Sequence, residues 1–505
     1  MRDLSLLEMR IVWDETLNKL RFISNDRQDL DALVENFSYP NPTAFFSKQY
    51  GFNAPDKVSV INKFGYFDIG LIYDVLDYIK TLYGSLKNLK IDKVTFAKIK
   101  SSTMPYEDFV STHPIEDFKV SNISKDRPLR DYQENIIRNL IYKGKGNGLF
   151  ESPTSSGKSF ILSNYIWTIH SQIDKDAKFL ILVPNKQLVS QFYSDMLDYG
   201  FLKDDIAMFS AGISKTEKAA LKSKMVIISN RQYLFNNTKD LPKIDVLIND
   251  EVHQTKSKSA TIELIEKLNP RVRVGCSGTL PKSKYELYTL KGIFVSVVHS
   301  ENLLDLQNKG YISSLQIDRI KIFDRYVDAN HDLGFSLNST KHFSAENEIS
   351  FNESWDEETK YIVDNFKKLY GPAIDYILDN YKGNILILFD RKQFGTSLYE
   401  LTKEGYGKSY QCYYIDGDVP VDKREEIRHN VEDSNNSVIF AQAATFSTGI
   451  NIKNLPNLCF CCNGKSFSRV VQSIGRILRL HKDKDYAQLI DLEFNFKYSQ
   501  RHTKE

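Results

Sequence analysis

The sequence predicts an α/β protein with two tandem parallel-sheet domains behind a small α+β module. Two observations support this fold class. Short apolar runs alternate with helical stretches between about residues 129 and 300, and the same rhythm returns after about residue 370. Strands that alternate with helices form parallel sheets with helices on both faces. Residues 1 to about 115 instead combine strand-like runs with one amphipathic helical run, which is typical of a small α+β unit.

Apolar runs place the expected elements. The N-terminal module should contain a strand at 58–61 and a helix at 69–82. In the first α/β domain, strands are expected at 148–150, 178–183, 224–228, 244–248 and 273–276. In the second, they are expected at 384–389, 410–415, 437–441, 458–462 and 486–489.

Changes in this pattern give the expected domain bounds. The module covers residues 1–115, and a proline-containing linker continues to 128. The two α/β domains cover 129–310 and 371–505, joined by a connecting segment at 311–370. Within that segment, residues 324–358 hold nine acidic and two basic side chains, a net charge of −7. We expect a solvated insertion there, because so negative a surface disfavours DNA.

Length and composition limit the function classes. The chain has 505 residues, 41% of them hydrophobic, which is enough for about three domains with buried cores. The 67 Lys and Arg residues nearly balance the 65 Asp and Glu residues, leaving a formal net charge of +2. This balance excludes a histone-like polycation and an acidic chaperone-like chain, but it permits a local basic groove.

The sequence shows neither a membrane span nor a secretion signal. No apolar run approaches the roughly 18 to 20 residues that a span needs, and the N-terminus mixes charges from Arg2 onward. Three of the five cysteines, Cys459, Cys461 and Cys462, crowd into one apolar run, where we expect buried thiols in a reducing compartment. A metal site is the alternative, but no second cluster would complete a zinc tetrahedron. We therefore expect a cytoplasmic protein with no membrane association.

A lysine-containing loop predicts a polyphosphate site. It follows the strand at 148–150 and precedes a helix-compatible run at 159–169. Backbone N–H groups of such a loop converge at the positive end of a helix. Gly157 permits close approach, Lys158 can reach the β and γ phosphates, and the Ser159 hydroxyl can bind Mg²⁺. The usual pattern starts with glycine where this chain has Ser152, so a serine-rich turn is the alternative. The expected phosphate-binding residues are Pro153, Thr154, Ser155, Ser156, Gly157, Lys158 and Ser159.

Two adjacent carboxylates strengthen that prediction. Asp250 and Glu251 come directly after the apolar strand at 244–248, and parallel sheets bind ligands at the carboxyl ends of their strands. Phosphoryl transfer needs one group to hold Mg²⁺ and another to orient or deprotonate the attacking water. We assign the first role to Asp250 and the second to Glu251; a helix cap is the alternative interpretation.

Two arginines in the second α/β domain could complete the site. Arg476 and Arg479 are three residues apart, so they share one face if this stretch is helical. The planar guanidinium binds phosphate through two parallel hydrogen bonds. A cation supplied by another domain stabilises the negative charge on the γ-phosphoryl group during its transfer. A cationic surface helix is the alternative.

These segments together resemble the superfamily 2 helicases and translocases, which have two RecA-like domains. Segments that resemble the family's successive motifs lie in the expected order at 129–133, 152–159, 183–188, 229–234, 250–253, 277–279, 389–392, 444–451 and 472–479. The family's motif V often carries Asp where this chain has Asn451, so no carboxylate role is expected there.

The resemblance implies ATP and Mg²⁺ as cofactors and assigns further roles. Gln133, with Arg130, would recognise the adenine, and Gly449 and Asn451 would add to the nucleotide site. The residues implied to couple hydrolysis to movement are His253, Ser277, Thr279 and Gln472. The positions implied to contact the nucleic-acid strand are Asn185, Lys186, Ser229, Arg231, Thr445 and Ser447.

Within the superfamily, the chain resembles in particular the UvsW-type phage recombination helicases. The cues are the segments 153–159, 249–253, 446–455 and 474–479. This family places a small α+β DNA-binding module before the motor, and it implies ATP-driven branch migration, fork regression and unwinding of branched DNA or R-loops. Partners would be branched or duplex DNA or RNA–DNA hybrids, bound without sequence specificity, in the host cytoplasm if the protein is phage-encoded. The alternatives are an RNA helicase, a restriction-type translocase subunit and a non-enzymatic scaffold.

The N-terminal module also carries a basic stretch. Six lysines face only Asp92 between residues 80 and 100, a local charge of +5 that suits a duplex backbone. A solvated lysine face is an equal alternative. The lysines are Lys80, Lys87, Lys90, Lys93, Lys98 and Lys100.

Overall fold

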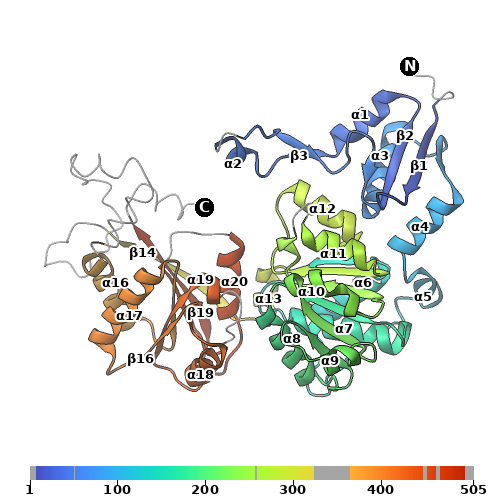
Figure 1. The fold of residues 1–505 in the computed structure, drawn as a ribbon. Helices are drawn as coiled ribbons and strands as arrows, with labels where there is room; N and C mark the ends of the chain where they lie inside the picture. The colour runs from blue at the N-terminus through green and yellow to red at the C-terminus, as the bar shows by residue number, and fades with distance from the viewer. Residues whose placement is uncertain are drawn as a thin grey trace. The chain divides into compact units, whose positions relative to one another are not determined.

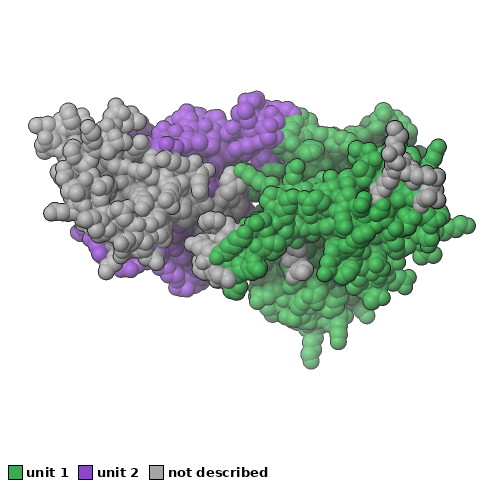
Figure 2. All heavy atoms as spheres, turned by 90° about the horizontal axis from the view of Figure 1, so that it is seen from above, with its two compact units in different colours: residues 1–152, 157–301 green, residues 153–156, 302–505 purple. Residues whose placement is uncertain are grey.

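The computed structural model describes residues 7–49, 52–255, 259–322, 364, 366–446, 452–461 and 467–494. The chain divides into two compact units, coloured separately in Figure 2. The first comprises Met1–Ser152 and Gly157–Glu301, and the second comprises Pro153–Ser156 and Asn302–Glu505. Within the described ranges, no helix has both the length and the apolar character needed to cross a membrane.

The N-terminal module is a mixed sheet covered by helices (Figure 1). Its four strands lie in the order β5-β2-β1-β6, with β1 antiparallel to β2 and parallel to β6. The helical prediction at 69–82 is confirmed as a 3₁₀ turn, η2, followed by α3. The elements are β1 (Met9–Asp14), β2 (Lys19–Ser24), α1 (Arg27–Asn36), β3 (Ser38–Pro40), α2 (Ala44–Gln49), β4 (Lys57–Ser59), β5 (Tyr66–Phe67), η2 (Ile69–Leu71), α3 (Ile72–Tyr83), β6 (Leu89–Ile91) and α4 (Lys93–Thr103).

The module packs on α12 (Lys284–Phe294) of the same unit. The Lys291 ammonium lies 2.6 Å from the Asp74 carboxylate, and the Tyr39 and Tyr288 rings are 5.2 Å apart. A Cβ atom on Gly70 would lie only 2.4 Å from the Lys291 carbonyl oxygen, so the two backbones touch. Ion pair, ring contact and close backbone approach therefore fix the module to the first sheet domain.

The proline-containing segment 101–128 also packs on this domain. It holds the end of α4 and a short helix, α5 (Glu107–Thr112), and then the buried Phe118 ring. That ring lies 5.2 Å from the Tyr142 ring at the end of α6 (Asp131–Tyr142). The Arg138 guanidinium donates to the carbonyls of Ile115 and Phe118 at 2.9 and 2.8 Å, which ties the segment to the helix.

The first α/β domain is a seven-stranded parallel sheet, as the alternating pattern predicted. The strand order is β13-β7-β12-β11-β8-β10-β9. All five expected strands are present, whereas β9 and β13 were not expected. The strands are β7 (Gly148–Glu151), β8 (Phe179–Val183), β9 (Ile206–Phe209), β10 (Val226–Asn230), β11 (Val246–Asn249), β12 (Val272–Ser277) and β13 (Val297–Val298). The main helices of this sheet are α6, α7 (Lys158–Thr168), α8 (Lys186–Tyr199), α10 (Arg231–Asn237), α11 (Ala260–Leu268) and α12.

The second α/β domain is a six-stranded parallel sheet in the order β14-β19-β18-β15-β17-β16. Its edge strand β14 comes from the segment expected to connect the domains, and it pairs with β19 over nine residues. The strands are β14 (Ser314–Ile322), β15 (Ile385–Phe389), β16 (Gln411–Ile415), β17 (Ser437–Gln442), β18 (Asn457–Phe460) and β19 (Tyr486–Phe494). Its helices include α16 (Phe366–Asn380), α17 (Lys392–Tyr406), α18 (Val421–Glu432), α19 (Ala443–Phe446) and α20 (Phe467–Ile477).

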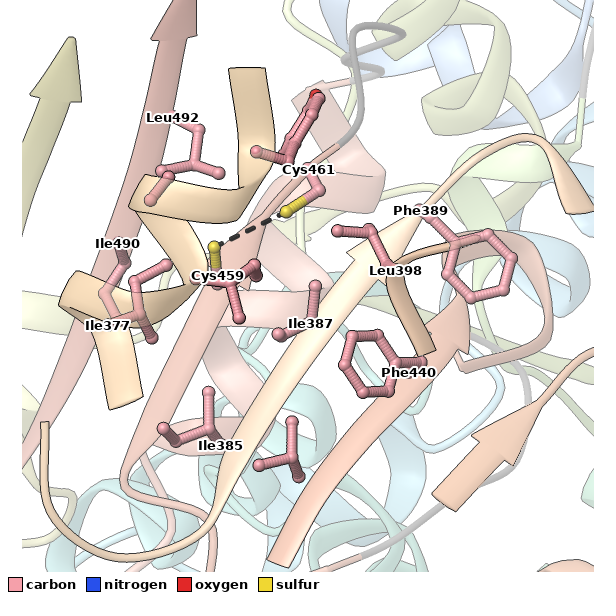
Figure 3. Close-up of a cluster of buried hydrophobic side chains, with 14 of the residues drawn as sticks. Ile377, Ile385, Ile387, Phe389, Leu398, Phe440, Cys459, Cys461, Ile490 and Leu492 are labelled. Atoms are coloured by element: carbon pink, nitrogen blue, oxygen red, sulfur yellow. Dashed lines mark hydrogen bonds between the residues drawn. The ribbon is translucent and has the colours of Figure 1, made fainter. Parts of the chain in front are cut away.

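The clustered cysteines are core residues of this sheet. The Cys459 and Cys461 side chains are buried among isoleucines, leucines and phenylalanines, with their sulfurs 3.7 Å apart (Figure 3). Over the described part of the chain, no group of three or more His, Cys, Asp or Glu side chains could hold a metal ion. Cys462 and the acidic stretch 324–358 lie outside the described residues.

Candidate functional site

Three neighbouring strands of the first sheet bring the predicted site residues together. In the order β7-β12-β11, the strand ends carry the lysine loop, Ser277 and the carboxylate pair. The Ser152 N–H donates to the Ser277 carbonyl at 2.9 Å, which joins the first loop to the middle strand. Because all three strands are parallel, these groups meet at the carboxyl edge, where α/β sheets bind ligands.

Lys158 pairs with Glu251 at this edge. Its ammonium lies 3.6 Å from a Glu251 carboxylate oxygen, and both side chains are largely buried, with exposed fractions of 14% and 17%. Lys158 is the first residue of α7, directly after Gly157, whose φ of +83° favours glycine. A Cβ atom at Gly157 would also lie 2.8 Å from the Gln133 amide nitrogen. The positive φ therefore favours glycine at this turn, and a larger residue would also displace the Gln133 amide.

Burial and pairing set opposite protonation preferences on the two carboxyl groups. Burial opposes the charge of Glu251, but Lys158 and then His253 outweigh it and lower the Glu251 pKa to about 2. Burial and the neighbouring Glu251 raise the pKa of Asp250. Burial likewise opposes the charge of Lys158, yet Glu251 and Asp250 raise its pKa. Glu251 is thus held as a carboxylate. A further cation near Asp250 would stabilise the charged form of that carboxyl group.

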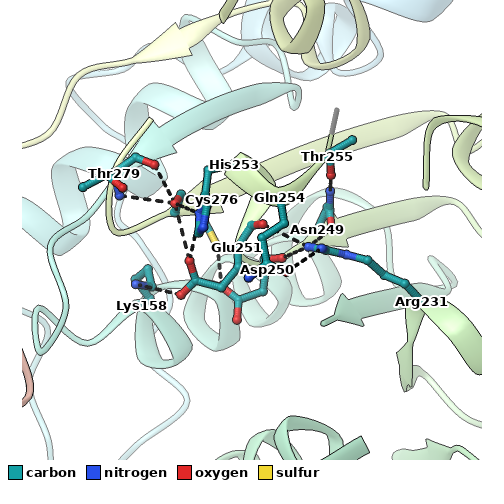
Figure 4. A network of polar contacts seen from close by, with 11 residues as sticks. Lys158, Arg231, Asn249, Asp250, Glu251, His253, Gln254, Thr255, Cys276 and Thr279 are labelled. Atoms are coloured by element: carbon teal, nitrogen blue, oxygen red, sulfur yellow. Dashed lines mark hydrogen bonds and ion pairs between the residues drawn. The ribbon is translucent and has the colours of Figure 1, made fainter. Parts of the chain in front are cut away.

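A chain of polar contacts runs on from Glu251 (Figure 4). The His253 Nδ1 atom lies 3.3 Å from Glu251 Oε2 and 2.7 Å from the Ser277 hydroxyl. That hydroxyl donates to the Thr279 carbonyl at 2.7 Å and accepts from the Thr279 N–H at 3.2 Å. The structure therefore joins three of the four predicted coupling residues to the carboxylate; the fourth, Gln472, lies in α20 of the second unit.

Cys276 is a site residue that the sequence did not indicate. Its thiol donates to the Asp250 carboxylate at 3.3 Å. Burial and the adjacent Asp250 raise the pKa of the Cys276 thiol, so it stays protonated and can donate. The pairing of β11 with β12, Asn249 beside Gly275, places the two side chains together. Only the strand order could have revealed this contact.

The predicted adenine-recognition residue lies at the start of α6. The Gln133 side chain is buried; its oxygen accepts from the Arg130 N–H at 3.0 Å, and its nitrogen donates to the Tyr132 hydroxyl at 3.3 Å. These contacts fix the amide beside Gly157, next to the phosphate loop.

The loop residues between Ser152 and Gly157 form a tight turn. The Ser156 N–H and hydroxyl both donate to the Pro153 carbonyl, at 3.1 and 2.5 Å, and Ser155 has a φ of +71°. Beyond the loop, the Ser159 hydroxyl lies 2.9 Å from the hydroxyl of Tyr199, the last residue of α8. Tyr199 is thus a second neighbour of the site that sequence reasoning missed.

The residues predicted to contact nucleic acid occupy different settings. Asn185 caps α8 by accepting from the Leu188 N–H at 3.0 Å, and Lys186 is exposed. In contrast, Ser229 is fully buried, and its hydroxyl donates to the Phe209 carbonyl at 2.6 Å. The Arg231 guanidinium turns towards Asp250 and Glu251, not towards solvent. The Ser229 hydroxyl is thus bonded inside the protein, and the Arg231 Nη atoms contact the turn at 249–254. A nucleic-acid contact of these two residues stays a prediction.

The second unit carries the two predicted arginines. Arg476 lies in the last turn of α20, with its guanidinium 5.3 Å from the centre of the Phe446 ring. Helix α20 ends at Ile477, so Arg479 lies beyond it and the two arginines do not share one helical face. The Thr445 side chain is buried in α19. Ser447, Gly449 and Asn451 lie outside the described residues.

Comparison with known proteins agrees with this arrangement. Residues 126–282 match the family described as Type III restriction enzyme, res subunit, and residues 369–481 match the helicase conserved C-terminal domain. The chain belongs to the superfamily 2 helicases.

Individual relatives extend this finding. The helicase is 27% identical over 362 residues to the ATP-dependent DNA helicase uvsW of Enterobacteria phage T4; the match covers 70% of this chain and 67% of the phage protein. A solved fragment from Vibrio vulnificus YJ016, described as an HsdR subunit of a type I restriction enzyme, matches with a TM-score of 0.53 and 16% identity over 79% of this chain and 68% of that one. The helicase MrfA in complex with DNA matches with a TM-score of 0.53 and 16% identity over 74% of this chain and 51% of that one. The structural matches show a shared fold.

The basic stretch of this helicase is partly paired with neighbouring groups. Lys90 lies 3.3 Å from Glu8, Lys100 lies 3.6 Å from Asp108, and the Lys98 ammonium lies 4.8 Å from the Trp13 ring centre. The other three lysines of the stretch are exposed: Lys80, Lys87 and Lys93.

Proposed function

We propose that this helicase uses ATP and Mg²⁺ to translocate on branched DNA, and so drives branch migration, fork regression and R-loop unwinding in recombination, repair or replication. The contact chain Lys158–Glu251–His253–Ser277 carries the proposal, because it joins a phosphate-binding lysine to a water-activating carboxylate and a coupling network. The choice of DNA is supported by the similarity to the phage T4 DNA helicase, and the choice of branched DNA rests on the resemblance of the sequence to the UvsW-type helicases.

The ion pair between Lys158 and Glu251 suggests how ATP hydrolysis is timed. Without nucleotide, Lys158 lowers the pKa of Glu251, and a carboxylate of such low pKa is a weak base. If Lys158 turns to the phosphates, Glu251 loses the partner that lowers its pKa most, and we expect that pKa to rise. Glu251 therefore becomes a better proton acceptor when ATP is bound.

The oxygen donors near the lysine suit a magnesium ion. Mg²⁺ prefers hydroxyl and carboxylate oxygens, and Ser159 and Asp250 present these groups. The raised Asp250 pKa shows a carboxyl group whose charge another cation would stabilise. When bound, Mg²⁺ would neutralise charge on the β and γ phosphates. We assign the remaining charge stabilisation to Arg476 and Arg479 of the second unit.

A second candidate is an RNA helicase or a restriction-type translocase subunit. The match of residues 126–282 to the res subunit family favours the restriction-type version. Both candidates use the same nucleotide site, so only the nucleic acid separates them.

The deciding experiment measures ATP hydrolysis with a panel of nucleic acids. The panel contains single strands, duplexes, four-way junctions and R-loops of DNA, together with single-stranded and duplex RNA. We expect junctions and R-loops to stimulate hydrolysis most. Stimulation by RNA alone would instead indicate an RNA helicase, and stronger stimulation by plain duplex DNA than by junctions would indicate a restriction-type translocase subunit.

Replacing Lys158 tests the nucleotide site itself. Lys158→Ala removes the group that holds the phosphates, so we expect hydrolysis to fall at least about a hundredfold with every nucleic acid. Lys222→Ala, at an exposed lysine of the same unit, is the matched control and should hydrolyse ATP like the parent. Full activity in Lys158→Ala would refute the assignment.

A further inference from the structure

Arg231 makes several polar contacts to the turn that carries Asp250 and Glu251, and none of these contacts was predicted from the sequence. Its Nη2 atom donates to the backbone carbonyls of Asp250 and Glu251, the latter at 3.0 Å, and to the Asn249 side-chain oxygen at 3.1 Å. Its Nη1 atom donates to the Gln254 side chain at 3.3 Å. Figure 4 shows the guanidinium lying against this turn from the start of α10.

The turn that Arg231 holds is strained. Glu251 has φ and ψ of +50° each, a left-handed conformation that costs a non-glycine residue free energy. Such a conformation persists only where surrounding groups hold it in place. The Arg231 guanidinium binds the carbonyls of Asp250 and Glu251, which flank the Glu251 Cα atom. These hydrogen bonds can stabilise the strained conformation, because charge-assisted hydrogen bonds are stronger than neutral ones.

The other contacts make the hold rigid. Asn249 is itself fixed, since its side-chain nitrogen donates to the Thr255 hydroxyl at 3.0 Å. The Asp250 N–H donates to the Leu182 carbonyl of β8 at 2.9 Å. In the strand order β11-β8-β10, Arg231 at the end of β10 therefore reaches across β8 to the end of β11. A lysine side chain ends in a single ammonium group, so it cannot donate the same planar set of hydrogen bonds as the guanidinium.

We propose that Arg231 is a positioning residue, which holds Asp250 and Glu251 in their active geometry through the backbone, and is not a contact to the nucleic-acid strand. The proposal rests on the proposed function for its effect on hydrolysis, but its structural core does not. It also connects the segment 229–234, which resembles a strand-contact motif, mechanically to the hydrolysis motif.

The first test is independent of activity. Hydrogen exchange of the amides at 250–254 is compared in the parent, Arg231→Lys and Arg231→Ala, together with DNA affinity over a range of salt concentrations. We expect both variants to exchange at least about tenfold faster at the turn, while DNA affinity and its salt slope stay unchanged. Unchanged exchange at the turn would overturn the proposal. If the salt slope of DNA binding also fell by about one, the result would favour a phosphate contact.

The second test uses hydrolysis. In the absence of nucleic acid, both variants should show kcat lowered about tenfold or more, with a smaller change in KM for ATP, because the carboxylates are misplaced. Arg27→Ala, at an exposed arginine paired with Asp31, is the control and should match the parent. Millimolar guanidinium ion should partly restore kcat to Arg231→Ala and not to Arg231→Lys. Unchanged kcat in both variants would contradict the proposal.

The two tests separate the inference from the proposed function. If the parent protein fails to hydrolyse ATP, the function is wrong, and the exchange measurement still decides the role of Arg231. If Arg231→Ala does not fold, Arg231→Lys keeps the charge and the volume needed for both measurements.

Discussion

Glu251 shows how its neighbours give one side chain several duties. Its carboxylate pairs with Lys158 at 3.6 Å and with His253 at 3.3 Å, while its backbone takes a left-handed conformation. Burial raises the pKa of the Glu251 carboxyl group, but the contacts with Lys158 and His253 outweigh burial and lower it. Each neighbour therefore changes either the charge or the position of the carboxylate that we expect to activate water.

His253→Ala tests the coupling assigned to this neighbourhood. The change removes the link between Glu251 and Ser277, so hydrolysis should continue while its connection to movement is lost. We expect unwinding of forked DNA to fall about tenfold or more and hydrolysis without DNA to fall only a few-fold. His429→Ala, at an exposed histidine of α18, serves as the control. A parallel fall in both rates would mean that His253 serves only to orient Glu251.

At the scale of elements, α12 connects two functional regions. It begins seven residues after Ser277, and its far end carries Lys291 and Gly292, on which the N-terminal module rests. Tyr288 of the same helix lies between the Phe37 and Tyr39 rings of the module. The helix that follows Ser277 in the chain therefore also contacts the module that we expect to bind DNA.

Gly70→Ala tests the close packing on this helix. The added methyl group would meet the carbonyls of Lys291 and Gly292 at 2.4 and 2.5 Å, so the module must move away. We expect the free energy of unfolding to fall by about 1 to 3 kcal/mol in urea denaturation, and stimulation of hydrolysis by junction DNA to weaken. Gly405→Ala, where nothing lies within 4 Å of the added atom, should leave stability unchanged or slightly raised. Equal stability of Gly70→Ala and the parent would rule out a tight interface.

On the scale of the whole molecule, the predicted site residues are divided between two units. The lysine, the carboxylates and the coupling network belong to the first, and Arg476 and Gln472 belong to the second. Each unit has its own parallel sheet and core, so each can fold around its own share of the site. We expect ATP hydrolysis to need residues of both units.

Arg476→Ala tests that division. Removing a cation that stabilises the transferring phosphoryl group should lower DNA-stimulated kcat by about a thousandfold, while binding of a fluorescent ATP analogue is retained. Arg428→Ala, at an arginine paired with Glu425 and Glu432 on α18, is the matched control. Undiminished turnover in Arg476→Ala would show that the second unit does not take part in hydrolysis.

The sequence by itself determined most strands of both parallel sheets and predicted the sheet edge at which the candidate site residues lie. Buried parallel strands are continuous apolar runs, and a motif that follows such a run must lie at its carboxyl end. That reasoning predicted, without any knowledge of strand order, that Lys158, Asp250 and Glu251 lie at one sheet edge, as the structure shows. Their catalytic roles stay predictions.

Only the tertiary structure decided which side chains meet. The short strands β9 and β13 and the edge strand β14 gave no clear apolar run, because edge and short strands bury less surface. The contact of Cys276 with Asp250 depends on β12 lying beside β11, and the contact of Arg231 with the Glu251 backbone depends on β10 lying one strand beyond β8. Strand order is set by contacts between residues far apart in the chain, and spacing along the sequence carries no record of them.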